Sequence, residues 1–146
     1  MGKTLLYKLF GVGRISKKLR PVLEAEGLQV WDEGIGGRIS MKHLKAPGKR
    51  FLYRTSGFSG FLAFTGKRIL AYAYGRPIIN LSFDHPHYRD MTFSLSLPER
   101  LDVTFESSLF NPDWKGRIKV SFKTEKAPQF ANVLQTRARS YRQGTL

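Results

Sequence analysis

The stretch that decides the fold runs from residue 92 to residue 106 and reads Thr-Phe-Ser-Leu-Ser-Leu-Pro-Glu-Arg-Leu-Asp-Val-Thr-Phe-Glu. Phe, Leu and Val alternate with polar residues on both sides of the Pro98-Glu99 connection. The segment 117–122 shows the same alternation. Such a period of two places one side of each strand in a core and the other in water, as in antiparallel sheets. These segments therefore predict a mainly antiparallel β domain.

The same period continues upstream. It recurs in five further segments, which are 38–44, 50–56, 61–64, 68–74 and 78–83. Turn residues separate most of them, as in Ala46-Pro47-Gly48, Thr65-Gly66-Lys67 and Gly75-Arg76-Pro77. About seven short antiparallel strands predict a small barrel or two orthogonal sheets. We expect the apolar residues of the later strands to face inward.

Helical patterns flank the strands. Residues 1–26 are predicted to form an N-terminal helical extension, broken by Gly11 and Gly13, with a second helix over 16–26. A C-terminal helix is predicted after Thr124, which is suited to cap it, and an apolar stripe of Phe130, Val133 and Leu134 faces the strands. We expect residues 27–136 to be the β domain with this helix, and 137–146 to be a basic tail.

The composition excludes several classes of protein. The 146 residues suit one domain, and the complete lack of cysteine excludes thiol catalysis, disulfides and thiolate metal sites. No apolar run approaches the roughly 18 residues of a membrane span. Lys8 interrupts the apolar residues near the N-terminus, so no secretory signal peptide is predicted. We expect a cytoplasmic protein, either free or peripheral to a membrane.

The charge is strongly positive and unevenly distributed. A net charge of +14 favours anionic partners, which are nucleic acid, acidic lipid or an acidic protein face. Residues 34–83 contain no acid, and acids are expected to dominate the exposed positions near Glu99, Asp102 and Glu106. The candidate anion-binding residues in the acid-free run are Lys45, Lys49, Arg50, Arg54, Lys67, Arg68 and Arg76. The alternative is a charge that serves solubility only.

One hairpin resembles a known family. In the segment 60–70, the pattern Gly-x-Leu-x-x-Thr-x-x-Arg followed by two apolar residues resembles the core hairpin of GRAM and bacterial pleckstrin-homology-like (PH-like) domains. The resemblance covers roughly residues 28–136 and implies a barrel of about seven antiparallel strands capped by a C-terminal helix. The chain is also similar to small bacterial proteins of that type, a likeness that implies no activity.

The resemblance also implies a place for an anion. PH domains often bind inositol phosphates through basic residues around the first hairpin, with a Lys followed by Lys/Arg-x-Arg. Lys45, Lys49, Arg50 and Arg54 lie around the corresponding turn. Arg50 and Arg54 are four residues apart rather than two, which departs from that pattern, although in a strand both point to the same face. A looser anionic site is the expectation, and many PH-like domains bind proteins or peptides instead.

Catalytic and metal chemistries find little support in the sequence. His85 and His87, beside Asp84 and Asp90, are the densest group of ligands, but Pro86 and the local polarity favour an exposed loop. His43, distant in sequence, is expected on the face of Ile39 and Met41. No Ser has a nucleophile-elbow signature, and the neighbours Asp32 and Glu33 would splay apart in a strand. We therefore predict no catalytic residue, no metal and no cofactor.

Three functional hypotheses follow. The leading one is a non-enzymatic binding module that engages an anionic membrane surface or a protein partner through its basic region. The N-terminal helix would add membrane contact through Leu5, Leu6, Leu9 and Phe10, unless these side chains pack on the barrel. The second is a nucleic-acid-binding β barrel that uses Tyr72 and Tyr74 among cations. The third is a small-ligand carrier or enzyme, which needs a polar group inside the barrel.

Overall fold

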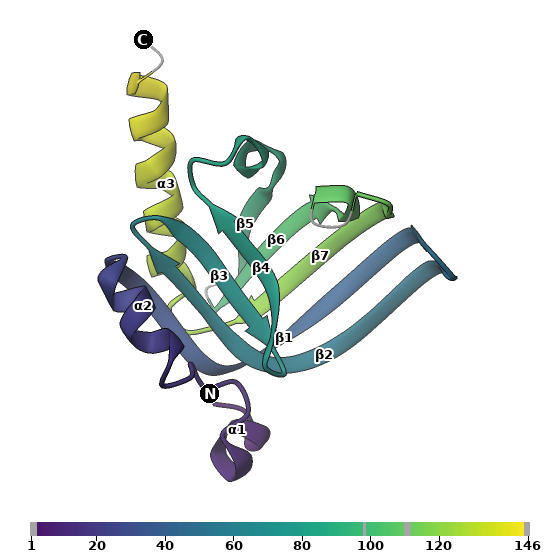
Figure 1. Ribbon diagram of the computed structural model, residues 1–146, viewed down its shortest axis with the longest axis horizontal. Coiled ribbons are helices and arrows are strands. Elements are labelled where there is room, and N and C mark those ends of the chain that lie inside the picture. Colours follow the sequence, from purple (N-terminus) through teal and green to yellow (C-terminus); the bar gives the residue numbers. More distant parts are fainter. Residues whose placement is uncertain (1–2, 98, 110–111, 145–146) are drawn as a thin grey trace.

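A computed structural model describes residues 3–97, 99–109 and 112–144, without the side chains of residues 49, 51, 97 and 137–144. Seven strands form one antiparallel sheet in the order β4-β3-β2-β1-β7-β6-β5 (Figure 1). The strands are β1 (Leu28–Ala46), β2 (Lys49–Thr65), β3 (Arg68–Ala73), β4 (Arg76–Ser82), β5 (Thr92–Leu97), β6 (Arg100–Glu106) and β7 (Lys115–Lys123). The helix α3 (Ala127–Gly144) follows them. The predicted strand number, antiparallel pairing and C-terminal helix are confirmed.

The sheet is open. Among the described residues, β4 pairs only with β3 and β5 pairs only with β6, so these two strands are its edges. A 3-10 helix, Pro86–Asp90, lies on the connection between them, and a second, Ser107–Leu109, follows β6. The predicted closure into a barrel is not confirmed.

The first two strands are longer than predicted. The separate strands expected over 50–56 and 61–64 are one strand, β2, which pairs with β1 along nearly its whole length. Gly57 and Gly60 do not interrupt it. A Cβ at Gly60 would lie 1.7 Å from the carbonyl oxygen of Tyr72 on β3, so this glycine permits a close approach of two backbones. The glycine pattern therefore marks packing and not a turn.

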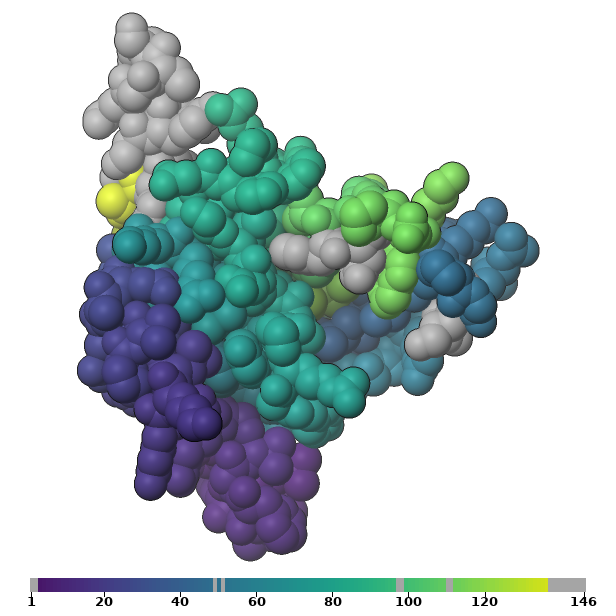
Figure 2. Space-filling view, viewed as in Figure 1, coloured from purple at the N-terminus to yellow at the C-terminus, as the bar shows by residue number. Residues whose placement is uncertain are grey.

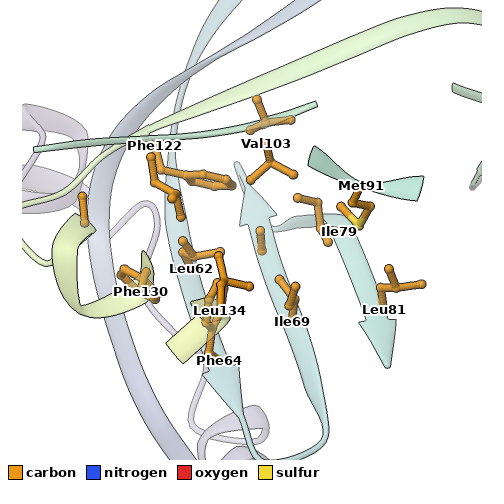
Figure 3. Close-up of a cluster of buried hydrophobic side chains, with 14 of the residues drawn as sticks. Leu62, Phe64, Ile69, Ile79, Leu81, Met91, Val103, Phe122, Phe130 and Leu134 are labelled. Carbon is orange, nitrogen blue, oxygen red and sulfur yellow. The ribbon is translucent and has the colours of Figure 1, made fainter. Parts of the chain in front are cut away.

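The core lies between the two halves of the folded-over sheet. Leu62, Phe64, Ile69 and Ile79 come from β2–β4, and Val103 and Phe122 from β6 and β7 (Figure 3). The predicted inward faces of β6 and β7 are confirmed, because Leu101, Val103, Phe105, Ile118, Val120 and Phe122 are all buried. Leu95 on β5 was expected to face inward but is 44% exposed, because β5 is an edge strand with no neighbour on its outer side.

The helix α3 covers one end of this core. Phe130 is fully buried and its ring lies 4.8 Å from that of Phe64, in an edge-to-face arrangement. Thr124, predicted to cap the helix, lies three residues before it and organises the turn that leads into it, because the Lys126 amide donates to Thr124 Oγ1 at 3.1 Å. Burial of a Phe side chain contributes about 1.5–3 kcal/mol, so Phe130 alone ties the helix firmly to the sheet.

The N-terminal segment covers the opposite, outer face of β2 and β3. It contains α1 (Leu5–Phe10) and α2 (Leu19–Ala25), separated by Gly11 and Gly13, which both have positive φ. The break predicted at these glycines is confirmed. Ile15 and Leu23 of this segment join Phe61, Ala63 and Leu70 in a second buried cluster. In Figure 2, this purple segment lies against the teal strands and α1 projects at the lower end.

Candidate anion-binding and membrane-contact surface

The predicted anion-binding residues do not form one site. Lys45 and Arg50 face each other across the tip of the β1–β2 hairpin, and both are exposed. Arg54 is exposed and pairs with Met41, whose side chain packs on the core. Lys49 lies in β2, and its side chain is outside the described residues. The hairpin tip projects from one side of the molecule (Figure 2), so it is a separate basic feature.

The other three predicted cations lie elsewhere. Lys67 and Arg68 are at the β2–β3 turn, at the end of β2 opposite the hairpin tip. The Arg68 guanidinium donates to Glu26 at 2.9 Å and to Asn80 at 3.1 Å, so it serves the fold. Lys67 and Arg76 are exposed, and Arg76 lies at the β3–β4 turn. No anion could contact the hairpin tip and this turn of β2 together, because β2 separates them by 15 or more residues at about 3.3 Å each.

The structure instead gathers cations in a groove on the outer face of β1, β7 and β6. Its volume is about 1070 Å³, slightly above the roughly 300–1,000 Å³ that is usual for ligand sites. The cations that line it are Arg38, Lys42, Arg100, Arg117, Lys119 and Lys123. Glu99 is the acid among its lining residues, and Asp102 and Glu106 lie on the same strand face. We call this feature the cationic groove.

Strand register explains the groove. Arg38, Ser40 and Lys42 of β1 lie opposite Ser121, Lys119 and Arg117 of β7. Paired residues on antiparallel strands project to the same face, about 5 Å apart, so the two rows of cations interleave. Small residues, among them Gly36, Gly37 and Ser40, form the floor. The long cationic side chains therefore border a shallow polar surface.

Asp102 lies on the groove side of β6 and corrects one expectation. It was expected to be exposed, but only 3% of its surface is accessible. Arg100 Nε donates to one carboxylate oxygen at 3.0 Å, and Lys119 Nζ is 3.7 Å from the other. Burial by itself would raise the pKa of Asp102, but hydrogen bonds from Ser121, Arg100 and Ser96 and the charge of Arg100 together lower it. This carboxylate therefore orients two groove cations.

At the adjoining end of the molecule, α1 is docked through its polar side. Its N-cap residue Thr4 is hydrogen-bonded to the Ser59 hydroxyl at 2.6 Å, and its amide donates to the Gly34 carbonyl at 2.8 Å. The Tyr7 hydroxyl donates to Glu33 Oε1 at 3.2 Å. The Tyr7 ring lies where a Cβ on Gly34 would be. The sheet therefore holds this helix by Thr4 and Tyr7.

The neighbours Asp32 and Glu33 splay apart and anchor the same segment. Asp32 accepts hydrogen bonds from Lys3 Nζ at 2.7 Å and from the Thr124 hydroxyl at 2.6 Å. The second oxygen of Glu33 accepts the Ile15 amide at 2.9 Å. The two carboxylates bind different groups, as expected for neighbours that splay apart in a strand, and both serve the fold.

The apolar side of α1 faces solvent. The side chains of Leu5, Leu6, Leu9 and Phe10 are 70%, 39%, 64% and 75% exposed, and α1 buries none of its residues. Leu5, Leu9 and Phe10 therefore do not pack on the sheet, whereas Leu6 is partly covered. The Thr4 methyl lies 3.5 Å from where a Cβ on Gly36 would be, and Gly36 lines the cationic groove. An exposed apolar helix thus adjoins a cationic groove.

Two other sequence features are structural. His85 Nδ1 accepts the amide of His87, and the His87 ring is 3.0 Å from Asp90, so both histidines organise their exposed 3-10 turn. Within the described ranges, no three His, Asp or Glu side chains are grouped to hold a metal. His43, expected on the face of Ile39 and Met41, is exposed, because its positive φ accompanies a bulge between β1 and β7.

The aromatic residues give limited support to the other hypotheses. Tyr72 is half-buried and stacks on Phe61 with ring centres 4.7 Å apart. Tyr74 is exposed, and its hydroxyl donates to the Gly57 carbonyl at 3.1 Å. Tyr53 is the aromatic residue that lines the cationic groove. The side chains clustered between the sheet halves are apolar, and the buried Ser107 hydroxyl, just after β6, has no hydrogen-bond partner among the described residues.

Comparisons with known proteins add no assignment. No family model, curated protein or solved structure matches this chain. Among the described residues, no helix has both the length and the apolar character needed to cross a membrane.

Proposed function

We propose that this protein is a non-enzymatic, PH-like binding module that docks peripherally on an anionic membrane surface in the cytoplasm. The observation that carries the proposal is the orientation of α1. Polar residues hold this helix to the sheet, and its apolar residues Leu5, Leu9 and Phe10 face solvent beside the cationic groove. A helix that only completed the core would have the reverse orientation.

The two features act through different forces on the same surface. Cations near an anionic leaflet contribute about 1 kcal/mol each, and their effect is screened by salt. Exposed Leu and Phe side chains gain free energy when they enter the interfacial region, because apolar area leaves water. The groove would attract the surface, and α1 would anchor the protein in it.

The PH-like assignment rests on the element order and on the hairpin. Seven antiparallel strands precede α3, and the Gly60–Leu70 pattern spans the β2–β3 turn. In this proposal the seam between β4 and β5 is the open side of an incompletely closed barrel. Nucleic acid is a weaker candidate, because single-strand binding combines cations with several stacking aromatics, and Tyr53 is the one aromatic among the described residues that line the groove.

Co-sedimentation with vesicles tests the proposal. We expect binding to phosphatidylglycerol/phosphatidylcholine vesicles, weaker binding to phosphatidylcholine alone, and a reduction of about tenfold in the double variant Leu9→Ser/Phe10→Ser. Val22→Ser is the matched control, because Val22 is an exposed apolar residue of α2, 46% accessible, and should leave binding unchanged. The variants touch no buried residue of α1, so their fold should persist.

Parallel mobility shifts with single- and double-stranded nucleic acid at physiological salt provide the opposing outcome. Binding to nucleic acid without binding to vesicles would overturn the membrane proposal and favour the nucleic-acid hypothesis. Binding to neither would leave a protein partner. Equal vesicle binding by the Leu9→Ser/Phe10→Ser variant and the unmodified protein would remove α1 from the mechanism.

A further inference from the structure

Ser40 lies at the centre of the densest group of cations in the cationic groove. Arg38 and Lys42 are two residues away on either side along β1, so their side chains project to the same face. Lys119 is directly opposite Ser40 on β7, and Arg117 is opposite Lys42. Four cations therefore surround one small hydroxyl residue.

Short side chains with hydroxyl groups form the floor of the groove around Ser40. Its hydroxyl is 3.2 Å from that of Thr55, the paired residue on β2. Either hydroxyl can act as the donor in this pair, so one of the two protons is free to turn toward a ligand. On the other side of Lys119 lies Thr104 of β6, which also lines the groove. Ser40 is the groove-facing residue between Arg38 and Lys42 on β1, and Tyr53 lies opposite Lys42 on β2.

Two of the four cations are partly engaged, and two are not. Lys119 is 3.7 Å from Asp102, and Arg117 is 3.5 Å from Glu106 in an exposed pair. Arg38 and Lys42 form no ion pair with a described residue. Around Ser40 the positive charge therefore exceeds the negative charge. Because Ser40 is small, the cationic groups can all approach a ligand bound above it.

We propose that the cationic groove binds a phosphate group over Ser40, with Arg38, Lys42 and Lys119 as its cations and the Ser40/Thr55 hydroxyls as its donors. The ligand class is a phosphomonoester or pyrophosphate, either soluble or on a lipid headgroup. This inference rests on the proposed function, since it names the anion that the same surface recognises. It places the anion away from the predicted residues of the hairpin tip.

Three properties of the site favour phosphate. A phosphate offers several strong acceptor oxygens, and it matches three cations and a hydroxyl that approach from different sides. The guanidinium of Arg38 has a planar fork that binds phosphate with two parallel hydrogen bonds. A planar carboxylate, with two oxygens, would leave part of this donor set unused. The Lys42/Arg117 pair, one step along the strands, provides room for a second phosphate.

Titration with pyrophosphate, followed by amide NMR shifts of the full chain, tests the site. We expect saturable binding with the largest shifts at Ser40, Thr55 and Lys119. Citrate, a carboxylate of comparable charge, should bind at least tenfold more weakly. The variant Arg38→Gln/Lys119→Gln should raise the Kd for pyrophosphate at least tenfold. The control Lys17→Gln/Lys18→Gln removes the same charge from exposed positions near α2 and should change the Kd less than twofold.

Vesicles distinguish the source of the phosphate. A preference for phosphatidic acid over phosphatidylglycerol at equal surface charge, lost in Arg38→Gln/Lys119→Gln, would identify a lipid headgroup. Pyrophosphate binding without that preference would identify a soluble phosphate. Equal weakening in both double variants, equal affinity for citrate, or no saturable binding would overturn the site. Because pyrophosphate binding does not require α1, its failure is separate from a loss of vesicle binding in Leu9→Ser/Phe10→Ser.

Discussion

At the scale of single residues, Asp102 is the charge on which the groove depends. Its pKa is lowered in the folded protein, whereas an unfolded Asp titrates near pH 4. The ionised form is therefore favoured by folding, so its contribution is fully present above about pH 4 and is lost as the pH falls through the folded pKa. Asp102→Asn should lower the free energy of unfolding by about 1–3 kcal/mol at pH 7.

Urea unfolding at pH 7 and at pH 3 measures this effect. The difference between Asp102→Asn and the unmodified protein should shrink at pH 3, because the carboxylate of the unfolded chain is then largely protonated and the advantage of the ionised folded form is smaller. Asp113→Asn is the control, since Asp113 is exposed and should change stability by less than about 0.5 kcal/mol. An undiminished difference at pH 3 would show that Asp102 acts through packing and not through charge.

At the scale of elements, the sequence predicted the positions of the strands better than it predicted which strands pair with each other. Alternation in 101–106 and 117–122 identified which residues of β6 and β7 are buried, because the period follows directly from the pleat. The cationic groove forms because β1, the first strand, pairs with β7, the last strand. Local patterns contain no information on that pairing. The alternation in 117–122 predicted that Arg117 and Lys119 face outward, but nothing in the sequence connected them with Arg38 and Lys42.

The orientation of α1 was also beyond sequence reasoning. The spacing of Leu5, Leu6, Leu9 and Phe10 predicts an amphipathic helix and does not tell which side the sheet holds. The orientation of α1 is determined by its contacts with residues distant in sequence. Thr4 bonds to Ser59, and Tyr7 bonds to Glu33. The polar side of α1 therefore faces the sheet.

Glu33 provides a test of how the N-terminal element is held. Glu33→Ala removes the acceptors of the Tyr7 hydroxyl and of the Ile15 amide, at about 1–2 kcal/mol of local stability. Hydrogen exchange should lose about tenfold or more protection at the Ile15 amide, while amides of β6 and β7 stay protected. Glu24→Ala, which removes only an exposed pair with Arg20, should leave Ile15 unchanged. Equal loss of protection in β7 would mean that the segment opens only with the whole fold.

At the scale of the whole molecule, the outer face of the sheet is divided between two roles. The N-terminal segment covers the part formed by β2 and β3 with an apolar cluster. None of the described helices covers the part formed by β1, β7 and β6, which is cationic. Because Thr4, at the start of α1, lies next to Gly36 of the groove, α1 lies at the boundary between the two parts. The net charge alone would not have indicated this arrangement.

The division of the outer face does not divide the core. One buried cluster joins β2–β4 to β6, β7 and α3, so both halves of the sheet should unfold together.

The fluorescence of the two tryptophans tests this, because they lie in different parts of the sheet. Trp31 of β1 has Arg20 4.0 Å and Lys126 4.9 Å from its ring centre, whereas Trp114 immediately precedes β7. In Trp114→Phe, urea unfolding followed by Trp31 fluorescence should therefore have the same midpoint as unfolding followed by far-ultraviolet circular dichroism. Trp31→Phe should show the same coincidence for Trp114, at a lower midpoint because two cation–π contacts of about 0.5–1 kcal/mol each are weakened. An earlier fluorescence transition of Trp31 would mean that the face covered by the N-terminal segment unfolds independently of the face with the groove.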